Sequence, residues 1–131
     1  MKTYCEFTFE AAHSVQPYSG LHGHTFIAKL TFGGESDAKY GWPVNLYEVE
    51  SFVREVKGGH DGAGLDHSNL DERHGIGVAS LENITKHLWS IFKSRFPGLE
   101  EVELKRGFTG SLEGCIYRGE SAAAIPLGLV A

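Results

Sequence analysis

Three histidines near the N-terminus are placed so that they could bind one metal ion. His22 and His24 are separated by a single residue, and in a β-strand such residues project from the same face. The alternating stretch 3–13 predicts a preceding strand, and a short loop over 14–21 would bring His13 back beside His22. Three imidazoles suit Zn²⁺, and three protein ligands with one open position are typical of catalytic zinc sites.

The same residues have a simpler interpretation, in which two exposed histidines end a hairpin and the third is unrelated. Two other metal-binding folds that use a His-x-His pair are disfavoured by the residues that follow. A cupin would need a Glu where Ala28 and Lys29 stand, and a metallo-β-lactamase would need Asp and His where Phe26 and Ile27 stand. From the residues alone, metal binding and the simpler interpretation both stay open.

A second candidate group lies in the stretch 58–77, which is rich in Gly, Asp and His. A loop of about twenty residues in so small a domain is often functional. The carboxylate of Asp66 could fix the tautomer of the adjacent His67 and raise its basicity, which would give a proton-transfer group that works near neutral pH. An Asp-His pair in a polar loop can equally be solvated only, and His60 and His74 are expected to lie on the surface.

The spacing of apolar side chains predicts the elements that must position these residues. Alternation indicates half-buried strands, and a spacing of three and four indicates helices. Ser80 is a candidate N-cap for the second helix, and Pro97-Gly98 is expected to end it. The expected elements are strands over 3–13, 24–33, 102–105 and 114–120, and helices over 45–56 and 80–96.

This order of elements, β-β-α-α-β-β, predicts an α+β fold in which a four-stranded antiparallel sheet carries both helices on one face. The other face needs a cover, and self-association is the simplest one. The chain of 131 residues is expected to form a single domain with its core over 3–120. The tail over 121–131 is small and apolar, and we expect it to be ordered only against another subunit.

Composition argues against several classes of protein. The formal net charge is −5 and the only basic pair is Lys105-Arg106, which argues against nucleic acid as a partner. No apolar run is long enough to span a membrane, and the chain begins in strand pattern without a signal-peptide core, so a cytoplasmic location is expected. Cys5 and Cys115 are far apart in the sequence and are expected to be buried thiols.

Six segments, in order, resemble the 6-pyruvoyltetrahydropterin synthase and 6-carboxytetrahydropterin synthase family. The first two are Phe9-Glu10-Ala11-Ala12-His13 and Leu21-His22-Gly23-His24-Thr25-Phe26. Each segment alone is weak, but six in order are specific, and together they span residues 3 to 120. The other four segments are 41–46, 65–70, 80–83 and 115–120.

The resemblance implies the tunnelling fold, in which β-β-α-α-β-β subunits close into a trimeric barrel, two trimers usually stack as a hexamer, and active sites lie between subunits. It also implies a zinc ion bound by His13, His22 and His24. In that family the zinc holds side-chain oxygens of a reduced pterin such as 7,8-dihydroneopterin triphosphate and acts as a Lewis acid. The residues that match Asp66 and His67 belong to the proton-transfer apparatus.

This chain departs from the family at the position of the catalytic base. The family usually carries a Cys shortly before the His-Gly-His segment, and some relatives carry a Glu, but the stretch 16–20 has neither. Tyr18 or Ser19 could replace the thiolate only if strongly activated. Strand parity places Cys5 with the core-facing side chains, so Cys5 does not replace it either.

The second departure is Arg106, which stands where the family usually has a Glu that grips the amino-pyrimidinone edge of the pterin. Arginine only donates hydrogen bonds and would meet that donor edge badly, whereas it suits a carboxylate, phosphate or carbonyl. Arg106 is therefore a candidate substrate-binding residue, and Glu113 in the following turn is a candidate replacement for the missing Glu. The helix start Ser80-Leu81-Glu82 completes the expected substrate-binding set.

Three functions remain open from the sequence. The first is a zinc-dependent lyase that cleaves or rearranges the side chain of a reduced pterin, dihydroneopterin or its triphosphate, by retro-aldol chemistry. The second is 6-carboxytetrahydropterin synthase of queuosine and deazapurine biosynthesis, with an unusual site. The third is a catalytically decayed protein that still binds zinc and pterin.

Overall fold

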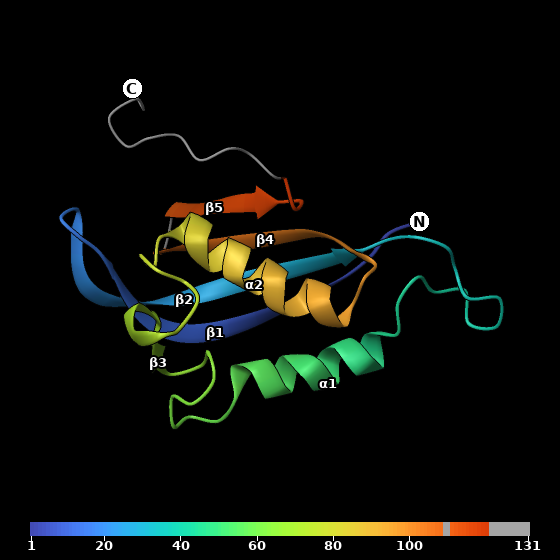
Figure 1. Cartoon of the computed structure of the whole chain (residues 1–131), viewed down its shortest axis with the longest axis horizontal. Helices are drawn as coiled ribbons and strands as arrows, with labels where there is room; N and C mark the ends of the chain where they lie inside the picture. Colours follow the sequence, from blue (N-terminus) through green and yellow to red (C-terminus); the bar gives the residue numbers. More distant parts are fainter. Residues whose placement is uncertain (109–110, 121–131) are drawn as a thin grey trace.

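A computed structural model of the chain describes residues 1–108 and 111–120, and in it one β-sheet carries both α-helices on the same face (Figure 1). The order of the strands across the sheet is β3-β1-β2-β4-β5. The four long strands pair antiparallel, and the short β3 pairs parallel to β1. The elements are β1 (Thr3–Val15), β2 (Ser19–Phe32), α1 (Leu46–Lys57), β3 (Ser68–Asn69), the 3₁₀ turn η1 (Leu70–Glu72), α2 (Leu81–Arg95), β4 (Leu99–Phe108) and β5 (Ser111–Tyr117).

The predicted α+β class and the order of the long elements are confirmed. The expected sheet of four strands has a fifth, because β3 pairs with Ala11 and Ala12 from within the stretch predicted to be a loop. The tail over 121–131, expected to be ordered only against another subunit, lies outside the described residues. Among the described residues, no helix has both the length and the apolar character needed to cross a membrane.

The first hairpin is longer than its hydrophobic pattern predicted. β2 begins at Ser19 and not at His24, and Ser19 pairs with Val15. The turn of this hairpin projects beyond the end of α2 (Figure 1). The two strands therefore stay paired beyond the part of the sheet that the helices cover. Side chains in this part need not be apolar, so an alternation of apolar residues did not reveal the longer strands.

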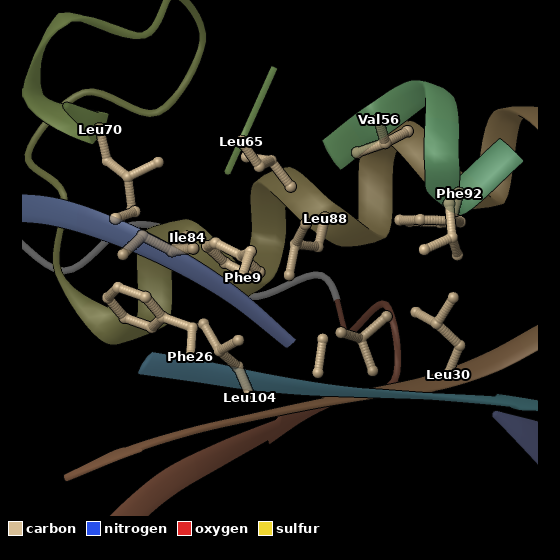
Figure 2. Packing of buried hydrophobic residues seen from close by; sticks show 14 of the residues in the cluster. Phe9, Phe26, Leu30, Val56, Leu65, Leu70, Ile84, Leu88, Phe92 and Leu104 are labelled. Atoms are coloured by element: carbon tan, nitrogen blue, oxygen red, sulfur yellow. The ribbon is translucent and has the colours of Figure 1, made fainter. Parts of the chain in front are cut away.

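The core lies between the sheet and the two helices (Figure 2). α2 packs over β4 and β5, and α1 contacts β1. Phe9 and Phe26, paired across β1 and β2, are fully buried and stack with ring centroids 5.1 Å apart. Their pairing fixes which side chains of the two strands face the helices. The opposite face of the sheet exposes large apolar side chains, namely Tyr4, Leu112 and Ile116.

We predict that Phe26→Ala lowers the free energy of unfolding by about 3–5 kcal/mol, because it leaves a cavity in the core beside the stacked ring of Phe9. Urea denaturation followed by circular dichroism measures the change. The control is Tyr18→Ala, whose side chain is 89% exposed and whose loss should cost about 0.5 kcal/mol or less. Equal losses in the two variants would contradict the packing described here.

Candidate functional site

The register of β1 and β2 brings the three predicted metal ligands together on the helix-covered face of the sheet. His13 lies opposite His22, and Ala11 lies opposite His24. The ring centroids are 4.7 Å apart for His13 and His22, 5.1 Å for His13 and His24, and 4.6 Å for His22 and His24. One nitrogen of each ring lies within 4.8 Å of the others, which is the spacing of a metal-binding cluster.

Two backbone carbonyls orient the rings of this cluster. His13 Nδ1 lies 2.6 Å from the carbonyl oxygen of Ala79, and His22 Nδ1 lies 2.6 Å from that of Gly20. Because a carbonyl oxygen only accepts, each Nδ1 must carry the proton, and each Nε2 carries a lone pair. The Nε2 atoms of His22 and His24 are 2.8 Å apart. These donors fit a divalent metal, since a ligating imidazole usually donates its other N–H to such a partner.

The surroundings of the cluster favour the neutral forms of His13 and His24. His13 is fully buried, and this burial lowers its pKa, with the nearby charge of Arg106 acting in the same direction. Burial also lowers the pKa of His24, followed by the effect of His22. Phe26 stands edge-on to His13 and His24, with centroid distances of 5.5 Å and 5.6 Å. A neutral imidazole can bind a metal without first losing a proton, so this apolar contact with Phe26 favours metal binding.

Arg106 lies beside the cluster, as its place at the end of β4 requires. Its Nη1 donates to the Nε2 lone pair of His13 at 3.2 Å, and its Nε donates to Glu113 at 3.2 Å. The Arg106 side chain is 21% exposed, whereas the Glu113 side chain is 67% exposed. The structure therefore brings two of the sequence-predicted substrate-binding residues to the histidines and holds a fixed positive charge there.

Asp66 and His67 form the second group, at the edge of β1. Asp66 Oδ1 accepts from the backbone N–H of Glu10 at 2.8 Å, and the N–H of His67 donates to the Glu10 carbonyl at 2.6 Å. Asp66 Oδ2 lies 3.1 Å from His67 Nδ1. The hydrogen bond from Glu10, followed by the contact with His67, lowers the pKa of Asp66. The carboxylate is thus positioned to hold the Nδ1–H tautomer and leave Nε2 basic.

His60, which was expected to be only a surface residue, joins this pair. Its ring stacks on that of His67 with centroids 4.4 Å apart, and its Nε2 lies 4.0 Å from Asp66 Oδ2. The chain turns back on itself between His60 and Asp66, in a segment that contains Gly62 and Gly64. A Cβ at Gly64 would collide with the carbonyl of Lys57, so this close approach requires glycine. The run of glycines between the two histidines was the signal that could have suggested the contact.

The start of α2 holds the remaining predicted substrate-binding residues. Ser80 caps the helix, with its Oγ accepting from Asn83 N at 3.1 Å. Leu81 is buried in the core, and Glu82 is exposed in the first turn. The described contacts of Ser80 and Leu81 are structural, and their role toward a ligand stays a prediction. The residue that touches the cluster here is Ala79, which sequence reasoning did not single out.

The described thiols do not supply the missing base. Burial raises the pKa of Cys5 to about 11 and also raises the pKa of Cys115. Cys115 Sγ is 2.8 Å from the hydroxyl of Thr85. At the hairpin, Ser19 accepts from Val15 N, and Tyr18 is exposed. Neither Tyr18 nor Ser19 has a described contact that would activate its hydroxyl.

An open hollow of about 660 Å³ borders both candidate groups, with His24 and His67 in its lining. Glu10, Thr25 and Gly107 also line it. The two candidate groups therefore lie at the same hollow.

The fold and the cluster define an α+β protein of the tunnelling-fold class with a site suited to a divalent metal. The model of the family described as 6-pyruvoyl tetrahydropterin synthase matches residues 2–120, and the chain belongs to this family. A dihydroneopterin monophosphate aldolase from Pyrococcus furiosus is 31% identical over 101 residues, which are 76% of this chain and 79% of that protein.

Solved structures support the same fold. The 6-pyruvoyl tetrahydropterin synthase of Caenorhabditis elegans superposes with a TM-score of 0.74 at 20% identity and covers 92% of this chain and 96% of its own. A catalytic-residue mutant of the Plasmodium vivax 6-pyruvoyltetrahydropterin synthase superposes with a TM-score of 0.61 at 14% identity, covering 90% and 98%. At these identities the likeness establishes the architecture.

We predict that both thiols of the folded protein react slowly with iodoacetamide at neutral pH, because only the thiolate reacts. A rise in the pKa of Cys5 from 9.0 to about 11 reduces its thiolate about 100-fold. Its alkylation should therefore accelerate up to pH 11, and should be fast at neutral pH in urea. Mass spectrometry of the alkylated protein measures both rates. Rapid alkylation of the native protein at neutral pH would show that a thiol base is available after all.

Proposed function

We propose that the chain is a zinc-dependent lyase that cleaves the side chain of a reduced pterin, dihydroneopterin or one of its phosphate esters. The observation that carries the proposal is the set of groups retained: three inward-facing imidazoles and the Asp66–His67 pair, with no ionised thiol beside them. Metal-assisted aldol cleavage needs a Lewis acid and one proton-transfer group, and this chain has candidate ligands for the first and the Asp66–His67 pair for the second. The name of the Pyrococcus furiosus relative supports the same reaction class.

A Zn²⁺ ion held by His13, His22 and His24 would act as a Lewis acid toward hydroxyl oxygens of the side chain. The remaining chemistry is proton transfer by this chain's own residues. His67 takes the proton from the hydroxyl on the second side-chain carbon, and that carbon becomes an aldehyde. The bond to the first carbon breaks, its electron pair enters the pterin ring system, and the first carbon then takes up a proton. One proton is removed and one is delivered, so His67 suffices for both.

Asp66 prepares His67 for this role. Asp66 Oδ2 lies 3.1 Å from His67 Nδ1 and accepts its proton in a hydrogen bond, so the basic Nε2 points away from the carboxylate. The carboxylate also stabilises the imidazolium that forms when Nε2 takes up a proton. The products are a hydroxymethyl pterin and a two-carbon aldehyde. Formation of a 6-pyruvoyl product needs a second base, and the thiols described above do not provide one.

The proposal includes a homo-oligomer, trimer or hexamer, with active sites between subunits. The open face of the sheet exposes Tyr4, Leu112 and Ile116, which a second copy would cover. Because the family resemblance implies active sites between subunits, we expect His67 to serve the cluster of a neighbouring copy. The unpaired thiols fit a reducing compartment such as the cytoplasm.

Arg106 suggests that the substrate is anionic. The resemblance leads us to expect a Glu at this position, whose carboxylate would accept hydrogen bonds. Arg106 instead places a donor, Nη1, 3.2 Å from Nε2 of His13. Its planar, positively charged guanidinium suits a phosphate oxygen. A metal bound to Nε2 of His13 would occupy its lone pair, so the Arg106 guanidinium could no longer donate to it. The guanidinium could then donate only to Glu113 and to the substrate. A phosphate at the end of the side chain is the group that such a cation would hold beside the metal.

We predict that His67→Asn lowers turnover about 10²- to 10⁴-fold while zinc stays bound at the three-histidine cluster, because a general acid–base group is lost. Asparagine is chosen because the backbone φ of His67 is 58°, a conformation that Asn tolerates. His13→Gln should lose the zinc of that cluster together with the activity, and His74→Asn should change neither. Mass spectrometry of the pterin products and metal analysis of the protein provide the readouts.

Three outcomes of that product analysis bear on the alternatives. A hydroxymethyl pterin from dihydroneopterin or its phosphates supports the proposal. A 6-carboxy product from dihydroneopterin triphosphate would instead identify 6-carboxytetrahydropterin synthase. Tight pterin binding without any product, while a Cys-containing relative turns over in parallel, would identify a catalytically decayed binding protein.

We predict that Arg106→Gln lowers kcat/KM about 10- to 100-fold for phosphorylated dihydroneopterin, since a charge-assisted hydrogen bond contributes about 1.5–3 kcal/mol. The unphosphorylated substrate should be affected far less. Arg106→Lys keeps the charge and should recover part of the loss. Equal losses for both substrates, with zinc retained, would show that Arg106 does not recognise the phosphate.

A further inference from the structure

We propose that His60, Asp66 and His67 form a second metal site, which takes a Zn²⁺ ion and, when filled, stops proton transfer by His67. The ligand atoms of these three residues lie within 4.8 Å of one another. Two imidazoles and one carboxylate are a donor set that binds zinc and related divalent metals. The inhibitory part of this inference rests on the proposed role of His67, and the binding part does not.

The carboxylate of Asp66 is fixed in place before any metal arrives. The residue is 9% exposed, and its Oδ1 is held by the backbone N–H of Glu10 at 2.8 Å. Oδ2 is left between the two imidazoles, 3.1 Å from His67 Nδ1 and 4.0 Å from His60 Nε2. A carboxylate that keeps one oxygen for the backbone and turns the other toward two histidines is a preformed centre for a cation.

The backbone at His67 is also held in an uncommon conformation. Its φ of 58° lies in the left-handed region, and its N–H donates to the Glu10 carbonyl at 2.6 Å. A non-glycine residue in this region is strained and persists only where its surroundings impose it. Here the imposed conformation directs Nδ1 of His67 toward Asp66, so two of the three ligands are held by β1.

His60 supplies the movable third ligand. Its side chain is 82% exposed and rests against His67, with the ring planes 27° apart. Both rings must point a nitrogen at one ion, so metal binding requires His60 to tilt out of the stack. Its exposure allows this movement without disturbing the core. The glycine turn that follows α1 keeps its backbone near the pair.

A metal at this site removes the basic nitrogen that the reaction needs. The ion would bind His67 through Nδ1, so the ring proton of the neutral imidazole moves from Nδ1 to Nε2. Nε2 then has no lone pair for a substrate proton, and Asp66 is engaged as a ligand. Excess zinc would therefore inhibit an enzyme that needs zinc at its first site.

The test is the zinc stoichiometry of the purified oligomer, measured by equilibrium dialysis and metal analysis without any pterin. We expect two zinc ions per chain for the native protein and for His74→Ala, a matched loss of an exposed loop histidine. His60→Ala should bind one. Circular dichroism verifies that each variant is folded. A His60→Ala variant that binds as many ions per chain as the native protein would overturn the proposal.

The inhibitory part has its own measurement. Lyase activity of the native protein should fall as zinc is raised beyond the first equivalent, whereas His60→Ala, normalised to its own activity with one equivalent, should keep its activity. Equal inhibition of both proteins would overturn the inhibitory role. If neither protein has lyase activity, the proposed function fails, and the two stoichiometries still decide whether the second site exists.

Discussion

The pairing register of β1 and β2 is the constraint on which the rest of this structure depends. It places Phe9 against Phe26 in the core and, two steps along the same face, His13 opposite His22. Side chains alternate across a strand, so a slip of one residue would move part of the cluster to the open face. The burial of two phenylalanines therefore secures the geometry of the neighbouring polar site.

Local pattern was enough to predict the four long strands and the approach of the three histidines to one another, because a period of two and a pair of histidines at that period are visible in the sequence. It was not enough for the surroundings of the cluster. The carbonyl of Ala79 and the guanidinium of Arg106 come from far along the chain, and only the packing of α2 and β4 brings them near. β3 was missed because two residues on a loop carry no periodicity.

The candidate site combines elements of different rigidity. The histidine cluster packs against the fully buried ring of Phe26, and backbone carbonyls orient the rings of His13 and His22. Asp66 is equally well anchored, whereas His60 and Glu113 are held only by exposed contacts. Arg106 also places a positive charge beside the cluster, where a ligand would meet it.

The hydrogen bond between His13 and the carbonyl of Ala79 links the cluster to the loop that precedes α2. A metal that binds only the folded chain stabilises it, and this bond extends the stabilisation to residues far from the ion in sequence. Loss of the His13 side chain would therefore also release the loop that leads into α2, so this imidazole has a structural role besides its candidate role as a metal ligand.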